Sequence, residues 1–97
     1  MATQKTRTLP WDAAEHLDSA EAAVAYLEMA LGEGDATLFA AALGDVARAR
    51  GMTEVARRAG LGRESLYKAL SPGGNPELAT ILKVVAALGL ELHTTAA

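Results

Sequence analysis

The sequence predicts a small all-α protein, a single compact bundle of about five helices. Three observations support this fold class. The chain has 97 residues, which suits one domain. Apolar residues make up 51% of it and aromatic residues only 4%, and alanine, which favours helices and lets them pack closely, is abundant. Apolar side chains also recur at helical spacing in several stretches that capping residues or glycines bound.

The first third of the chain is predicted to hold a flexible arm and an acidic helical segment. Residues 1–10 are polar, lack periodicity and end in a proline, so we expect an arm there. Residues 11–35 form the acidic segment, in which Asp12 caps a short helical turn beside Trp11 and a longer helix begins after Ser19. The apolar side of that longer helix is predicted from Val24, Leu27 and Leu31, with Ala20, Ala23 and Ala30 beside them.

Residues 36–97 are predicted to form a helix-turn-helix domain, and its first helix covers residues 36–50. Asp35 caps this helix, and its apolar stripe contains Phe39, Leu43 and Val46, widened by Leu38 and Ala42. Two arginines lie in the last turn, Arg48 and Arg50. They suit the helix dipole, and they equally suit contact with phosphates, so both roles remain open.

Residues 52–70 read as a short helix, a tight turn and a second short helix. Thr53 is expected to cap the first helix, and the turn Gly60-Leu61-Gly62 lets a glycine take a positive φ. The second helix points Leu66 and Leu70 inward, and its other faces are polar. This pattern is typical of a helix-turn-helix, whose second helix lies in the DNA major groove. The alternative is an ordinary αα-hairpin with a solvated face.

The remaining residues are predicted to form a loop, a last helix and a short strand. Asn75 is expected to cap the helix, with Pro76 at its first position. The helix carries the clearest amphipathic pattern of the chain, with Leu78, Ile81, Leu82, Val85 and Leu88. Residues 90–94 alternate between apolar and polar, which indicates a strand that pairs with its copy across a two-fold axis.

The net charge of −3 is divided unevenly along the chain. Residues 1–45 hold two basic and eight acidic residues, a net charge of −6, whereas residues 46–97 hold seven basic and four acidic residues, a net charge of +3. This asymmetry suggests one cationic and one anionic partner, although an acidic half that only aids solubility is the alternative.

Several classes of protein are not expected. The chain has no cysteine, no apolar run that spans a membrane and no signal-peptide core, so we expect a cytoplasmic protein. His16 and His93 lack the spacing of metal ligands, and no nucleophile stands beside a base. The sequence therefore predicts no enzyme, no metal site and no cofactor.

Three segments resemble one known family: PWDAAEHLDS at 10–19, AYLEMALGEGD at 25–35, and residues 43–92. They resemble the HigA-like addiction-module antidotes, antitoxins that carry a lambda-repressor-type (Xre) helix-turn-helix. The resemblance implies a homodimer that binds the palindromic promoter of its own operon as a repressor. It also implies neutralisation of a basic toxin, an mRNA interferase of the RelE/HigB type, in a type II toxin–antitoxin module. Two alternatives remain: a free-standing Xre-type regulator without a toxin, and a helical interaction module whose helix-turn-helix no longer binds DNA.

The DNA contacts follow from positions in the second helix and its surroundings. Arg63 is the best candidate to bind a guanine in bidentate fashion, while Glu64 accepts from a cytosine amine or pairs with a neighbouring cation. Tyr67 and Lys68 lie one turn further on and reach bases or backbone, unless the Tyr67 ring packs on the domain. The expected backbone contacts are Thr53, Arg57, Ser65, Ser71 and Asn75.

Overall fold

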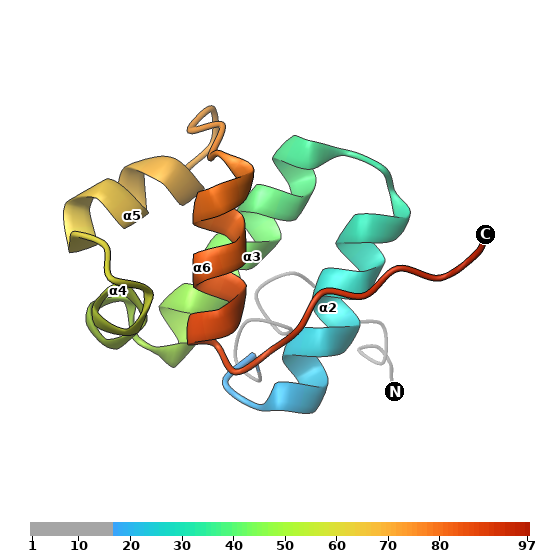
Figure 1. Cartoon of the computed structure of the whole chain (residues 1–97), viewed down its shortest axis with the longest axis horizontal. Coiled ribbons are helices and arrows are strands. Elements are labelled where there is room, and N and C mark those ends of the chain that lie inside the picture. Colours follow the sequence, from blue (N-terminus) through green and yellow to red (C-terminus); the bar gives the residue numbers. More distant parts are fainter. Residues whose placement is uncertain (1–16) are drawn as a thin grey trace, which may run out of the picture.

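The computed structural model describes residues 17–97, which form five helices and no strand (Figure 1). The helices are α2 (Ala20–Gly32), α3 (Ala36–Arg50), α4 (Met52–Ala59), α5 (Arg63–Leu70) and α6 (Leu78–Ala87). Over these residues the expected all-α class is confirmed. The predicted arm at 1–10 and the predicted helical turn beside Trp11 lie outside the described residues. None of the described helices is long and apolar enough to cross a membrane.

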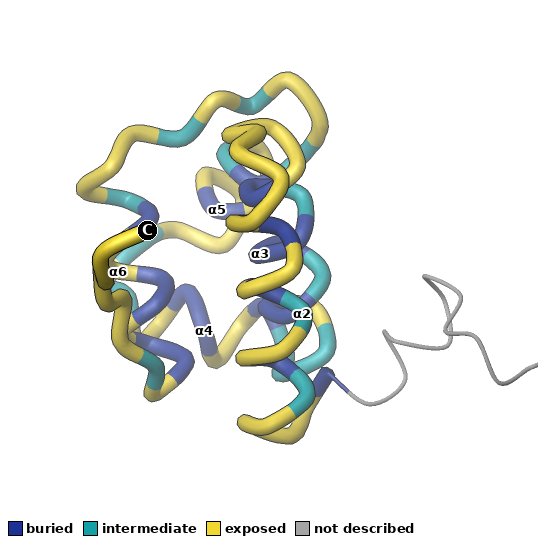
Figure 2. The backbone as a smooth tube through the Cα atoms, turned by 90° about the vertical axis from the view of Figure 1, so that its right-hand side faces the viewer, coloured by how far each residue is buried: buried dark blue, intermediate teal, exposed yellow. Residues whose placement is uncertain are grey.

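Helix α3 lies at the centre of the bundle and packs against each of the other four helices. Its residues Leu43, Val46 and Ala47 are fully buried, and Phe39 and Ala42 extend the same stripe. Buried residues line the inner sides of the helices, while the outer sides of α2, α5 and α6 are exposed (Figure 2). The predicted bounds of α3 and its Asp35 cap are confirmed, and so is its apolar stripe except for Leu38, which is exposed.

Gly44 allows α5 to lie close to α3. A Cβ atom at this buried position would lie 3.0 Å from the carbonyl oxygen of Leu70 and 3.3 Å from the Leu70 Cβ. Any larger residue would therefore push the end of α5 outward, and with it the polar face of that helix.

Two predicted helix starts are wrong. Helix α4 begins at Met52 rather than after Thr53, because Gly51 with φ 106° ends α3 and at once precedes α4, and Met52 is buried. Helix α6 begins at Leu78, with Glu77 as its extended N-cap residue. Asn75 has a left-handed φ of 51°, which does not suit a cap, and so Pro76 remains in the loop.

Two apolar stripes agree only in part with their predicted composition, because some of their large residues lie on the exposed side. On α2 the buried residues are Ala23, Leu27 and Ala30, whereas Val24 and Leu31 are exposed. On α6 the helix buries Ile81, Val84, Val85 and Ala87 and leaves two leucines exposed, Leu78 and Leu82. The outer faces of these helices therefore carry large apolar side chains.

The short strand predicted at 90–94 is wrong for the single chain, because no strand occurs within residues 17–97. The chain leaves α6 through Gly89 at φ 76°, and the Leu90 N–H donates to the carbonyl of Val85. Leu92 then lines the same groove as Leu31 at the end of α2. Without a neighbouring strand, an extended segment has nothing with which to form a ladder.

Candidate nucleic-acid interface

A left-handed residue joins α4 to α5 at the predicted turn. Gly60 has a φ of 73°, which a residue with a side chain rarely adopts. The Leu61 N–H donates to the carbonyl of Ala56 at 2.9 Å, and this bond closes the end of α4. Gly62 is extended and leads directly into α5. The two short helices and the tight turn between them therefore agree with the prediction.

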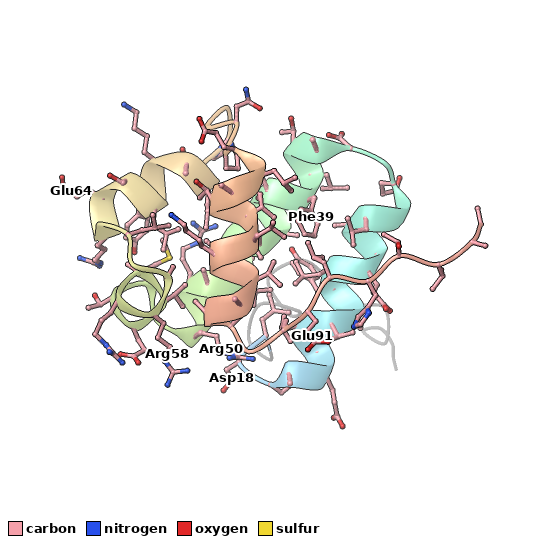
Figure 3. All side chains as sticks on the ribbon, in the orientation of Figure 1. Asp18, Phe39, Arg50, Arg58, Glu64 and Glu91 are labelled. Atoms are coloured by element: carbon pink, nitrogen blue, oxygen red, sulfur yellow. The ribbon has the colours of Figure 1, made fainter. Side chains whose placement is uncertain are left out.

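Two leucines hold α5 against the core and leave the rest of its surface exposed. Leu66 is 0% exposed and Leu70 is 1% exposed. Five polar or aromatic residues predicted to contact DNA are exposed on this helix: Arg63, Glu64, Ser65, Tyr67 and Lys68. The structure therefore brings these five together on one helix at the edge of the molecule (Figure 3).

Arg63 and Tyr67 interact with each other on this surface. The guanidinium carbon of Arg63 lies 5.2 Å from the centre of the Tyr67 ring, which is a cation–π distance. This contact orients the arginine and covers part of the ring of Tyr67, which is 36% exposed. Glu64 points away from the body of the protein and forms no ion pair with another residue in the range 17–97 (Figure 3).

Four of the residues predicted to contact the DNA backbone lie off α5, and two of them, Ser71 and Arg57, have hydrogen-bond partners within the protein. The Ser71 hydroxyl donates to the carbonyl of Lys68 at 2.8 Å and so closes the end of α5. Arg57 donates to Glu54 through both Nε and Nη2. Thr53 is exposed in the first turn of α4, and Asn75 is exposed in the loop.

Glu54 holds two arginines on the surface of α4. Arg57 and Arg58 both donate to its carboxylate, and the Arg58 Nε lies 2.8 Å from Oε2. The hydrogen bond from Arg57, followed by that from Arg58, lowers the pKa of Glu54 to about 2. The carboxylate is therefore charged at neutral pH, and it partly neutralises the two arginines beside the candidate interface.

The described part of the chain has two sides of opposite charge. Residues 17–47 contain six carboxylates and neither lysine nor arginine. Residues 48–70 contain Arg48, Arg50, Arg57, Arg58, Arg63 and Lys68 against two glutamates. Helix α2 lies on the side of the molecule opposite to α4 and α5 (Figure 1). A nucleic acid bound on α5 would therefore lie next to the basic residues of α4 and α5 and away from the carboxylates of α2.

The two arginines that end α3 are engaged within the protein. The Arg50 Nη1 donates to the carbonyl of Leu88 at 3.1 Å and so joins the end of α3 to the end of α6. The Arg48 Nη2 donates to Asp45 at 2.9 Å. These partners favour a structural role over the phosphate contacts that the sequence left open.

A hydrogen-bonded group that was not predicted from the sequence joins α2 to α3. The Tyr26 hydroxyl donates to Asp45 Oδ2 at 2.7 Å, while Arg48 donates to Oδ1 of the same carboxylate. The spacing of Asp45 and Arg48 by three residues could have revealed the ion pair. The tyrosine comes from 19 residues upstream, and no local signal connects it to Asp45.

We expect Tyr26 to ionise at about pH 12 rather than near pH 10. Burial, followed by the hydrogen bond to Asp45 and the charge of that carboxylate, raises the pKa of Tyr26 from 10.0 to about 12. Because the protonated phenol is favoured in the folded state, the pair stabilises the fold fully below pH 10. Its contribution is lost as the pH rises towards the folded pKa.

A pH titration of the tyrosinate absorbance of the Tyr67→Phe variant measures the pKa of Tyr26, since this variant keeps Tyr26 as its single tyrosine. Adding Asp45→Ala should lower the midpoint. A midpoint near pH 10 in Tyr67→Phe, with no effect of Asp45→Ala, would show that the bond is absent in solution.

The chain is similar to known proteins over most of its length. Residues 7–96 match a family model described as "Probable addiction module antidote protein". An uncharacterized protein of Haemophilus influenzae is 53% identical over 83 residues, which cover 86% of this chain and 86% of that protein. A comparison with solved structures found no match. The length of the match to the family model identifies the chain as a member of the addiction module antidote family.

Proposed function

We propose that this protein is the antitoxin of a type II toxin–antitoxin module. It neutralises a RelE/HigB-like mRNA interferase and represses its own operon by binding the promoter as a dimer. Membership of the antidote family supports the antitoxin half of this proposal. A toxin that grips RNA must be basic, and the six carboxylates of residues 17–47 supply a surface that attracts such a partner.

The observation that carries the DNA-binding half is the exposed polar face of α5. Two buried leucines hold α5 against the core at the edge of the bundle. The polar side chains of this helix are exposed. In this proposal Arg63 at the start of the helix binds a guanine, and Lys68 and Ser65 reach further bases or phosphates. Glu64 has no competing cation among the described residues and remains free to accept from a cytosine amine.

The exposed apolar residues of helix α6 support the proposal that the protein is a dimer. Leu78 is 69% exposed and Leu82 is 48% exposed, and the exposed Ala86 continues this apolar row one turn further along the helix. A single helix-turn-helix reads one half-site, and two half-sites about 10 bp apart require a two-fold dimer. The exposed apolar row of α6 therefore supports this helix as the dimer interface, in place of the C-terminal strand expected from the sequence.

Co-expression with the small reading frame adjacent to its gene tests the proposal. The neighbour should arrest growth when expressed alone, and this protein should restore growth and co-purify with it. The purified protein should also shift the promoter fragment of the operon. A harmless neighbour that does not bind, together with a shifted promoter, would leave a free-standing regulator. Failure to shift any DNA would leave an interaction module.

A further inference from the structure

The outer face of α2 and α3 contains a groove that the helix-turn-helix does not use. Its volume is about 370 Å³, and it is lined by Tyr26, Met29, Ala30, Glu33, Leu38, Ala41, Ala42 and Asp45. The floor consists of three alanines, whose small side chains leave the space between the two helices unfilled. No residue that lines the groove comes from α4, α5 or α6.

Two large apolar side chains form the walls of the groove and stay in contact with solvent. Met29 is 63% exposed and Leu38 is 42% exposed. An occupant that covers both would remove apolar surface from water, which favours binding. Methionine is also flexible, so this wall adapts to the shape of the side chain that enters.

Carboxylates stand at the polar positions of the groove. Glu33 comes from the end of α2, and Asp45 is held in place by Tyr26 and Arg48. Arg48 neutralises part of the charge of Asp45. Residues 17–47, which include the rest of the groove, contain no lysine or arginine, so the groove keeps a negative charge. The groove therefore favours an apolar side chain flanked by cationic residues.

We propose that this α2–α3 groove is the site at which the antitoxin holds its toxin. A segment of the basic toxin inserts an apolar side chain between Met29 and Leu38, and neighbouring lysines or arginines meet Glu33 and Asp45. The inference rests on the proposed antitoxin function and names the surface that performs it.

Charge decides between the possible occupants of this groove. A second copy of this chain would bring another acidic α2–α3 face against the first, and a nucleic acid would bring phosphates against carboxylates. A basic protein avoids both repulsions. Because α2 lies on the side opposite to α5, the toxin in the groove leaves the DNA-binding face open (Figure 1). Toxin and operator can then be held at the same time.

The test compares Met29→Lys with Val24→Lys. Both positions lie on α2, both carry exposed apolar side chains, and both changes add one positive charge, but Val24 does not line the groove. The affinity of each purified variant for the neighbour-encoded toxin is measured by calorimetry. We expect Met29→Lys to weaken binding by at least about tenfold and Val24→Lys by less than about twofold, as for an anchor inside and a position outside an interface. Promoter binding should remain unchanged in both.

Four results would overturn the inference. Equal losses of toxin affinity in the two variants would mean that net charge alone causes the effect. No loss of affinity in either variant would mean that the toxin binds elsewhere. In both cases, neutralisation of the toxin by the wild-type protein would still support the antitoxin function. A fall in the sedimentation mass of free Met29→Lys would make the groove an interface between copies of this chain. A neighbour that wild-type protein neither binds nor neutralises would remove the antitoxin function and this site with it.

Discussion

Replacing Leu66 by alanine should lower the free energy of unfolding by about 2–5 kcal/mol, the usual range for a leucine truncated inside a core. Leu66 is fully buried on α5 and belongs to the cluster that also contains Leu43, Val46 and Val55. Its truncation removes apolar contacts and leaves a cavity between α5 and the rest of the bundle. A domain of this size buries a modest core, so the loss is a large part of its total stability.

Glu64→Ala is the matched control, since Glu64 lies on the same helix, is exposed and forms no ion pair within residues 17–97. Its unfolding free energy should stay within about 0.5 kcal/mol of the wild-type value. Urea denaturation followed by circular dichroism measures both variants. An unchanged midpoint for Leu66→Ala would mean that α5 is not held by the core in solution.

The sequence predicted those parts of the fold that local signals determine. Asp35 caps α3 and Gly51 ends it, so both ends of that helix could be read from neighbouring residues. The turn at Gly60 and the two buried leucines of α5 could be read in the same way, because the turn and the helix lie within a few residues of each other. For this reason the exposed face of the candidate DNA interface was predictable.

Which large apolar residues of α2 and α6 lie on the exposed side was not predictable, because the sequence is rich in alanine. A shift of one position turns a helix by about 100°, and both Val24 and its neighbour Ala23 suit an apolar stripe. The packing decides in favour of Ala23, whose small side chain lets α2 approach α3. The larger apolar side chains then remain outside, and the groove beside Met29 exists for the same reason.

Contacts between distant residues also escaped the sequence analysis. Arg50 bonds to a carbonyl 38 residues away, and Tyr26 to a carboxylate 19 residues away. Such pairs depend on how the helices meet. The wrongly predicted starts of α4 and α6 have a related cause. Thr53 and Asn75 suit a cap, but α4 begins one residue before Thr53 at the buried Met52, and the loop after Asn75 continues to Glu77 before α6 begins.

Replacing Arg63 by alanine should weaken binding to the operon promoter by about 1–3 kcal/mol, and the loss should fall on one base position of each half-site. Arg63 begins α5, is exposed, and its guanidinium is oriented by the Tyr67 ring at 5.2 Å. A base contact made in this way adds specificity, whereas a phosphate contact would weaken binding to every sequence alike.

Arg58→Ala separates these two effects, because it removes the same charge from α4, where Arg58 is already paired with Glu54. Promoter variants at each position of the half-site, titrated at one salt concentration, should show relaxed discrimination with Arg63→Ala and unchanged discrimination with Arg58→Ala. Equal losses across all promoter variants would assign Arg63 to the phosphates. Unchanged affinity for every DNA would instead leave the exposed face of α5 to a protein partner, and the acidic groove would then be one of two protein-binding surfaces on this molecule.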